Sequence, residues 1–452
     1  MTSTSVSVDE LRRLVDLGEV DTVELVVVDL QGRLQGKRVT ALHFLDGVMC
    51  NGSEAQNYLL ATDIDMSTVD GYDLASWSSG YGNMVMHPDL SSLRRLPWHP
   101  GSVLAFCDVR DRSEQPLTVS PRQLLRDQLG QLAVHGWTAI TGTELEFELF
   151  ENSYQEAWRD GYRSLRPATH YGSDYAMLDT RGNGAFLSRL TRELTQAGIE
   201  IESVLSEAAL GQHEIVLSCG DALTTSDNHA LAKFGSKQVA ASEGRSLTFM
   251  AKLDEHEGNS CHIHFSLRDP DDQPVFAGDD EHGFTPVMRS FLAGQLAFLP
   301  ELTLLFAPNV NSYKRFVDGS YAPTVISWGF DNRTCALRVV GSGKSLRFEH
   351  RVPGGDVNMH LAMAAVVAAG LRGVSEQLEL SDPLTGSAYA SGHPRVPGSL
   401  REARRLFQDS KVAAEAFGPD VVRHYSRMAE IELEAFDRAV TDWEKFRGFE
   451  RM

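Results

Sequence analysis

The chain has 452 residues, and its 42 lysines and arginines against 62 aspartates and glutamates give a formal net charge of -20 at pH 7. This acidic balance argues against a surface for nucleic acid or for an anionic membrane, because both partners are themselves negative. The length exceeds the usual size of one hydrophobic core, so two domains are expected. The five cysteines are scattered and odd in number, which favours free thiols in the reducing cytoplasm over a disulfide framework.

The first part of the chain is predicted to form a small domain. Its opening residues hold no apolar run that could serve as a signal peptide. Apolar runs over residues 22–29 and 33–39, with a Gln-Gly turn between them, predict a hairpin, and residues 104–109 predict a further strand. The polar stretch that follows is expected to be a linker, so we expect domains over residues 1–112 and 113–452.

The second part alternates helices and strands to the end of the chain. Ser120 and Pro121 begin an amphipathic helix that ends at Gly136. The most apolar segment, residues 361–371, is rich in alanine and too short to span a bilayer, so a buried helix is expected there. Composition and pattern together are typical of a soluble two-domain enzyme.

The most informative stretch alternates polar and apolar residues and places His262 and His264 on one face of a predicted strand. A second strand repeats the pattern, with Glu144, Glu146 and Glu148 on one face and apolar residues on the other. Three like charges on one strand face repel each other, so they are tolerated only in water or around cations. Together the two strands indicate a sheet surface that holds metal. For any one of these residues, a core histidine or a solvated glutamate is the alternative.

Further acidic and basic residues extend this candidate site. Glu207 and Glu214 flank a turn, and Glu349 lies on a short alternating strand. Carboxylates with a single imidazole suit hard divalent cations such as Mg²⁺ or Mn²⁺, and no cysteine cluster of the structural-zinc kind accompanies them. Arginines beside carboxylates suit a polyphosphate or carboxylate substrate, because guanidinium groups bind oxygen pairs. Without a P-loop motif, these features predict metal-dependent phosphoryl transfer; salt bridges are the alternative for some arginines.

Several motifs follow one another in a specific order along the chain. They are Asp29-x-x-Gly-Arg-x-x-Gly-Lys37, Pro88-Asp-Leu-Ser-Ser-Leu-Arg94, Thr143-Glu-Leu-Glu-Phe147, Gly211-Gln-His-Glu214, Gly258-Asn-Ser-Cys-His-Ile-His264, Asn311-Ser-Tyr-Lys-Arg315, Asn332-Arg333 and Arg347-Phe-Glu-His-Arg351. In order and spacing they resemble the glutamine synthetase family, and within it the branch that ligates glutamate to an amine other than ammonia. The resemblance implies an α+β fold, with an N-terminal β-grasp domain over 1–112 and a glutamine synthetase-type α/β catalytic domain over 113–452.

The resemblance also implies ligands and an assembly. ATP would be the co-substrate, Mg²⁺ or Mn²⁺ would occupy two or more places in each site, and the protein would be a homododecamer of two stacked hexamers. ATP would phosphorylate the γ-carboxylate of glutamate, and a neutral amine would then displace phosphate. No nucleic acid or membrane partner is expected.

Roles for individual residues follow from the same resemblance. The metal ligands would be Glu146, Glu207 and Glu214 for one ion and Glu144, His262 and Glu349 for a second. The residues that contact ATP would be Glu202, His264, Ser266, Arg333, Arg338, Lys344 and Arg347. Those that hold glutamate would be Gly258, Arg315 and Arg351. The catalytic residues would be Glu207, Arg315, Tyr321 and Arg333.

Two departures from the family pattern bear on the amine. The Asp-Gly-Ser-Ser loop that helps the family to bind ammonium is missing, and Asp63 and Asp65 are the candidates for that site. The flap motif reads Gly319-Ser-Tyr-Ala-Pro323, with Tyr321 in place of the glutamate that closes over the intermediate. Both departures favour an organic amine over ammonia: ethanolamine, putrescine, a longer polyamine or an alkylamine. A true glutamine synthetase is the alternative, and a silent scaffold is disfavoured because every metal position is filled.

Overall fold

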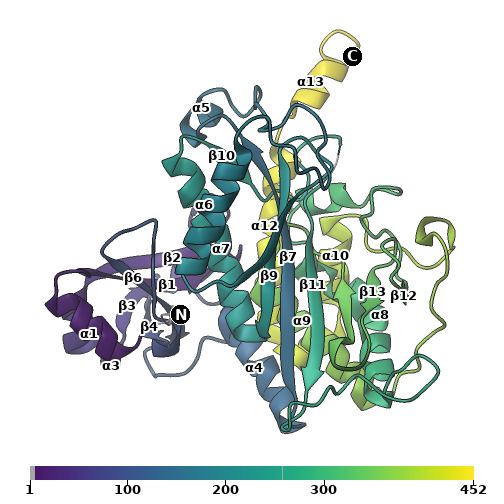
Figure 1. The fold of residues 1–452 in the computed structure, drawn as a ribbon, viewed down its shortest axis with the longest axis horizontal. Helices are drawn as coiled ribbons and strands as arrows, with labels where there is room; N and C mark the ends of the chain where they lie inside the picture. Colours follow the sequence, from purple (N-terminus) through teal and green to yellow (C-terminus); the bar gives the residue numbers. More distant parts are fainter. Residues whose placement is uncertain (1–5, 257) are drawn as a thin grey trace.

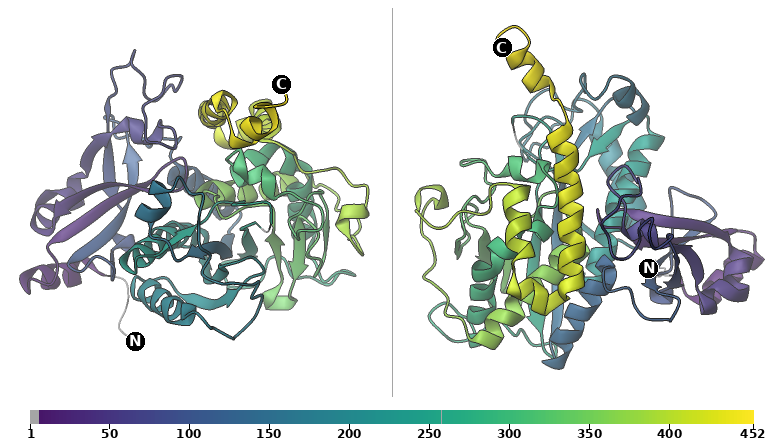
Figure 2. Two further views of the ribbon diagram at one scale, coloured as in Figure 1. Left: turned by 90° about the horizontal axis from the view of Figure 1, so that it is seen from above. Right: turned by 180° about the vertical axis from the view of Figure 1, so that it is seen from behind.

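The computed structural model describes residues 6–256 and 258–452, so Glu257, which precedes the histidine strand, lies outside the described residues. Within these ranges a smaller N-terminal domain lies to one side of a larger second domain (Figure 1 and Figure 2). The helices and strands of the N-terminal domain are α1 (Val8–Asp16), β1 (Thr22–Val28), β2 (Leu34–Thr40), α2 (Ala41–His43), α3 (Met49–Asn51), β3 (Ser53–Gln56), β4 (Asn83–Pro88), β5 (Arg94–Arg95) and β6 (Ser102–Arg110).

The N-terminal sheet has the strand order β2-β1-β6-β4-β3, with β5 paired to β6 off this path. β1 and β2 pair antiparallel with Thr22 opposite Thr40, which confirms the predicted hairpin. β1 runs parallel to β6, which contains the strand predicted over residues 104–109. A hairpin with a parallel neighbouring strand agrees with the predicted β-grasp arrangement.

Side chains along β1 alternate between two hydrophobic cores. Leu25 and Val27 pack inside the N-terminal domain, in the same core as Leu11 of α1. Val26 and Val28 face the opposite way and belong to the core of the second domain. A strand that is buried on both faces has a nearly continuous apolar sequence, and β1 thereby joins the two domains.

The second domain is built around a mixed sheet. Its strands are β7 (Thr138–Phe150), β8 (Ile201–Ser206), β9 (Gln212–Asp221), β10 (Ser246–Thr248), β11 (Cys261–Arg268), β12 (Trp328–Phe330), β13 (Leu337–Val340) and β14 (Arg347–His350). Their order is β12-β13-β14-β11-β7-β9-β8, with β10 paired to β7 off this path. β7 lies between β11 and β9 and pairs antiparallel with both, so the histidine strand and the glutamate strand are direct neighbours.

Helices pack around this sheet. They are α4 (Pro121–Val134), α5 (Tyr154–Arg159), α6 (Asn183–Gln196), α7 (Ala222–Ser242), α8 (Pro286–Phe306), α9 (Met359–Glu376), α10 (Leu400–Gln408), α11 (Lys411–Phe417), α12 (Pro419–Arg438) and α13 (Asp442–Gly448). α9 contacts α4, α7 and α8, and most of its residues are buried, which confirms the buried helix predicted over residues 361–371. No helix among the described residues combines the length and the apolar character that crossing a membrane requires.

A buried ionic network also joins the domains. Nη2 of Arg122 on α4 lies 2.7 Å from Oδ2 of Asp89 and 2.9 Å from Oδ2 of Asp227. Its Nη1 pairs with Asp108 of β6, and Nε2 of His360 on α9 lies 2.9 Å from Oδ1 of Asp227. A buried guanidinium group is stable only where its donors have such partners, so this network fixes how the N-terminal domain sits on α4 and α7.

Candidate active site

The register of neighbouring strands brings the predicted acidic residues together. Glu144 of β7 pairs with His262 of β11, and Glu146 of β7 pairs with Glu214 of β9. Ligand atoms of Glu144, His262 and Glu349 all lie within 4.8 Å of one another, and the same holds for Glu146, Glu214 and His262. We call these residues the acidic cluster.

Glu144 bridges the two histidines of β11. Its Oε2 lies 3.0 Å from Nδ1 of His262, and its Oε1 lies 2.8 Å from Nε2 of His264. Burial alone would raise the pKa of Glu144, but hydrogen bonds from His262 and His264 outweigh it and hold that pKa well below its usual range. Glu144 is therefore an ionised carboxylate at neutral pH.

Glu349 is fully buried among cationic groups. Nη1 of Arg338 donates to its Oε2 at 2.8 Å, and Nη1 of Arg351 donates to its Oε1. Nδ1 of His262 lies 3.2 Å from the same Oε1. Burial would raise the pKa of Glu349, but the charges of His262 and Arg351 lower it to about 2. The protein thus keeps this carboxylate ionised away from water.

Two residues that were not predicted as site residues hold Glu146 in place. The backbone N–H of Ser260 donates to Oε2 of Glu146 at 2.6 Å, and its hydroxyl donates to Oε1 at 2.5 Å. Nε2 of Gln212 donates to Oε2 at 3.3 Å. Ser260 lies two residues before His262, and Gln212 two before Glu214, so strand alternation was the signal that could have found them.

Glu207 and Glu214 lie among other carboxylates. Burial raises the pKa of Glu214 to about 9, and the charges of Glu144 and Glu146 add to this effect. Burial and the charge of Glu146, with a further contribution from Asp174, raise the pKa of Glu207 to about 8. Buried and half-buried carboxylates beside an imidazole fit divalent cations, whose charge would allow all of them to ionise.

Four of the residues predicted to contact ATP border the acidic cluster. His264 and Arg338 contact it directly through Glu144 and Glu349. Nε of Arg347 donates to Nδ1 of His264 at 3.1 Å. Ser266 lies two residues further along β11, and its buried hydroxyl donates to a backbone carbonyl of the loop before β14 at 3.1 Å.

The other three predicted ATP residues lie on the surface. Glu202, Arg333 and Lys344 have exposed side chains. Arg333 lies 3.9 Å from the exposed Asp331. Within the described part of the chain, none of the three forms an ion pair with the acidic cluster, and their contact with ATP stays a prediction.

The three residues predicted to hold glutamate are neighbours. Arg315 is buried, and its Nη2 donates to the carbonyls of Arg351 at 3.1 Å and of Pro353 at 3.0 Å. Burial lowers the pKa of Arg315 to about 10. A Cβ at Gly258 would lie 2.8 Å from Cγ of Arg315, so glycine allows this close packing. Because Arg351 also pairs with Glu349, the group adjoins the acidic cluster.

Tyr321, Asp63 and Asp65, the remaining predicted site residues, are not part of the acidic cluster. Tyr321 is exposed, has a positive φ of 58°, and lines a cavity of about 550 Å³ together with Arg333. Burial raises the pKa of Glu432 on α12, and the charges of Asp65 and Asp63 add to this effect. The two aspartates therefore lie beside α12, and their place in an amine site stays a prediction.

A sheet lined with carboxylates, an imidazole and paired arginines could hold divalent cations beside an anionic ligand, as in the class of enzymes that transfer phosphate groups. Residues 118–447 match the family described as glutamine synthetase, catalytic domain, and the chain belongs to this family. The protein is therefore a ligase of the glutamine synthetase type. The family and the α+β fold predicted from the motifs are confirmed.

Relatives and solved structures resemble the chain over nearly its whole length. It is 54% identical to the gamma-glutamylethanolamide synthetase GlnA4 of Streptomyces coelicolor, over 98% of this chain and 96% of the relative. It is 35% identical to the glutamate–isopropylamine ligase of a Pseudomonas species, over 97% of each chain. The structure of a GmaS/ADP complex matches with a TM-score of 0.85 at 27% identity, and the match covers 97% of this chain and 99% of that one.

Proposed function

We propose that the chain is an ATP-dependent ligase that joins the γ-carboxyl group of glutamate to an organic amine, with ethanolamine as the preferred substrate. The observation that carries this proposal is the 54% identity, over 98% of the chain, to a relative named gamma-glutamylethanolamide synthetase. Other relatives are named glutamate–isopropylamine ligase and glutamate–methylamine ligase, so alkylamines are the alternative substrates. Tyr321 supports the proposal because it replaces a carboxylate that would act on ammonium.

Mg²⁺ or Mn²⁺ is the proposed occupant of the acidic cluster. The proposed ligands of one ion are Glu144, His262 and Glu349, whose ligand atoms lie within 4.8 Å of one another. Those of a second ion are Glu146 and Glu214, which lie equally close to His262, together with Glu207, which the family resemblance adds. When bound, such ions neutralise the phosphate oxygens and let a carboxylate approach them.

Two surfaces beside the cluster suit the two anionic substrates. We assign the triphosphate to His264, Ser266, Arg338 and Arg347, with Glu202, Arg333 and Lys344 further out. We assign glutamate to Gly258, Arg315 and Arg351. The buried Nε atoms of Arg315 and Arg351 have no hydrogen-bond partner among the described residues, and an anionic ligand satisfies such donors.

The proposed reaction has two steps. A γ-carboxylate oxygen of glutamate attacks the γ-phosphorus of ATP, and the bond to ADP breaks, which yields γ-glutamyl phosphate. The amine nitrogen then attacks the acyl carbon, phosphate leaves, and the nitrogen loses one proton. We assign Glu207 to accept that proton. Arg315 and Arg333 would stabilise negative charge on the reacting groups, and Tyr321 would cover the intermediate.

A phosphate-release assay tests this function. The kcat/KM values for ethanolamine, isopropylamine, putrescine, spermine and ammonium are compared at fixed glutamate and ATP. Ethanolamine is expected to give the highest value. A highest value for ammonium would make the enzyme an ordinary glutamine synthetase, and no release with any amine would make the chain a silent scaffold.

We also propose that the chain assembles as a homododecamer of two stacked hexamers in the cytoplasm. α13 projects from the body of the protein (Figure 1), and the side chains of Trp443 and Phe446 on it are 67% and 80% exposed. Neighbouring aromatic side chains on a projecting helix are suited to burial against a second copy of the chain.

A further inference from the structure

A cavity of about 540 Å³ lies between the two domains, and we call it the interdomain cavity. Its walls come from the turn between β1 and β2, from α7 and α12, and from the segment that follows β10. Phe234 and Phe249 contribute aromatic rings to it, and three cationic side chains, those of Arg33, Lys233 and Lys237, also line it. The volume lies within the range of about 300–1,000 Å³ that is typical of sites for small organic ligands.

Two lysines of α7 place their ammonium groups near the same aromatic ring in this cavity. Nζ of Lys233 lies 5.5 Å from the centre of the Phe249 ring, and Nζ of Lys237 lies 5.9 Å from it. Nζ of Lys233 also donates to the carbonyls of Gly355 at 2.8 Å and Val357 at 3.3 Å. Burial lowers the pKa of Lys233 to about 8, and the charge of Lys237 adds to this effect. The two ammonium groups therefore repel each other, and an anion beside them would relieve that repulsion.

Lys237 is the cation of this cavity that has no counter-ion. Nε of Arg33 donates to Oδ2 of Asp29 at 2.8 Å, whereas Lys237 forms no hydrogen bond and no ion pair within residues 6–256 and 258–452. Two carboxylates, those of Asp356 and Glu432, also line the cavity. Oδ2 of Asp356 already accepts hydrogen bonds from two neighbouring side chains, at 2.8 Å and 2.6 Å. Burial raises the pKa of Glu432 and so opposes its ionisation.

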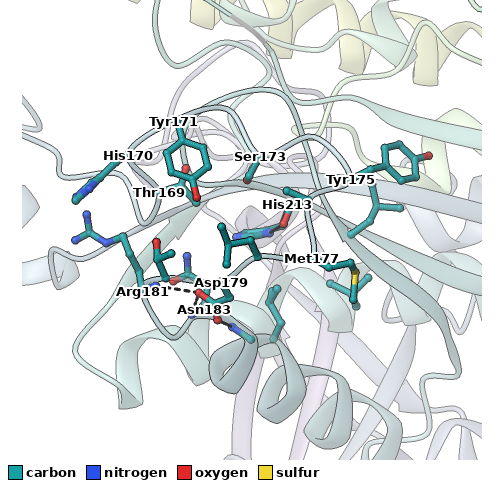
Figure 3. A pocket seen from close by; sticks show the side chains of 18 residues that line it. Thr169, His170, Tyr171, Ser173, Tyr175, Met177, Asp179, Arg181, Asn183 and His213 are labelled. Atoms are coloured by element: carbon teal, nitrogen blue, oxygen red, sulfur yellow. Dashed lines mark hydrogen bonds between the residues drawn. The ribbon is translucent and has the colours of Figure 1, made fainter.

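The cavity of about 220 Å³ in Figure 3 differs in this respect. Its carboxylate, Asp179, accepts hydrogen bonds from the backbone N–H groups of Arg181 at 3.1 Å and Asn183 at 3.0 Å. Its guanidinium group, that of Arg181, pairs with Glu151. Because the chain itself satisfies both charges there, the interdomain cavity is the better candidate for a charged ligand.

We propose that the interdomain cavity binds a small organic anion with an apolar body, whose acidic group pairs with Lys237 and Lys233. Charge-assisted hydrogen bonds of this kind are the stronger ones. The apolar body would pack against Phe234 and Phe249, where it leaves water. None of the residues assigned to metal, ATP or glutamate lines this cavity, so the ligand would be bound together with the substrates. The inference does not depend on which amine the enzyme uses.

The test uses two fluorescent probes of nearly the same shape. Anilinonaphthalene sulfonate is an anion, and phenylnaphthylamine has the same rings without the sulfonate group. In Lys237→Ala we expect the Kd of the anionic probe to rise roughly tenfold to a hundredfold, the range of a hydrogen bond to a charged group. The Kd of the neutral probe should change by less than about threefold, because it loses no charged contact. Saturating glutamate and ADP are present throughout, so that the substrate sites are closed to the probes.

Two further variants serve as controls. Lys237→Arg keeps the positive charge and should retain most of the affinity for the anionic probe. Lys411→Ala removes an exposed ammonium group from α11 and should leave both Kd values unchanged. An unchanged Kd of the anionic probe in Lys237→Ala, or equal losses for the two probes, would overturn the inference. Anionic probe that glutamate and ADP displace would lie in the substrate sites, and this result would overturn the inference as well.

Discussion

Among the carboxylates of the acidic cluster, Glu349 should contribute most to the free energy of unfolding, because it is fully buried between Arg338 and Arg351. We expect Glu349→Ala to abolish turnover and to lower the free energy of unfolding by about 3–5 kcal/mol, since it leaves buried cations unpaired. Urea denaturation measures this loss. Asp331→Ala is the matched control: it removes an exposed carboxylate from the same Arg338 and should cost less than about 1 kcal/mol. Similar losses in both variants would refute the argument.

Glu207 and Glu214 should make the metal-free protein sensitive to pH. Burial and neighbouring carboxylates raise their pKa values to about 8 and about 9, whereas the value in an unfolded chain is about 4.3. Between these limits the folded chain holds protons that the unfolded chain has released, so stability falls as pH rises. In EDTA we expect Tm to fall from roughly pH 6 to roughly pH 9, and Mg²⁺ or Mn²⁺ to remove most of that fall. A Tm in EDTA that stays constant or rises over this pH range would contradict the prediction.

The sequence predicts chemically reactive residues better than the residues that hold them. The carboxylates and the histidine of the acidic cluster stand out because alternation on a strand places ionisable groups on one shared face. Ser260 and Gln212 act through hydrogen bonds across strands, whose pairing is decided only in the folded protein.

Among the strands, too, some can be predicted from the sequence and others depend on tertiary pairing. The hairpin of β1 and β2 and the long strands β7 and β11 were predictable, because their residues alternate or form clear apolar runs. Residues 46–102 show no clear periodicity, and the short strands β3, β4 and β5 within them are held by pairing with one another and with β6. Propensity is a weak guide where strands are this short and tertiary pairing decides.

Helices α8 and α9 pack closely because glycines lie where their backbones meet. A Cβ at Gly294 would overlap the carbonyl oxygen of Ala369, and one at Gly373 would overlap that of Ser290. We expect Gly294→Ala to lower the free energy of unfolding by about 1–3 kcal/mol, because the two helices must move apart. Gly130→Ala on α4 meets nothing within 4 Å and should instead raise it by about 0.5–1 kcal/mol. Urea denaturation compares the two, and a stabilised Gly294→Ala would show that the helices are not closely packed.

For the whole molecule, β1 and the Arg122 network fix the N-terminal domain on the second domain. In this fixed arrangement Asp63 and Asp65 lie beside α12. We predict that the N-terminal domain closes the active site of a neighbouring subunit and not that of its own chain. A sequence cannot predict such a contact from periodicity, because it joins different copies of the chain.

α13 offers a direct test of the assembly. It has no buried residues, so its removal should leave the hydrophobic cores of the single chain intact. We expect a chain without residues 441–452 to form particles with fewer copies, because Trp443 and Phe446 no longer bury their rings against a second copy. Light scattering and sedimentation measure the mass of the particles. The control is Trp158→Ala, which removes an exposed ring from α5 and should leave this mass unchanged. If the shortened chain kept the full mass, the contact between copies would have to lie elsewhere; if it lost mass and turnover together, the active site would depend on the assembly.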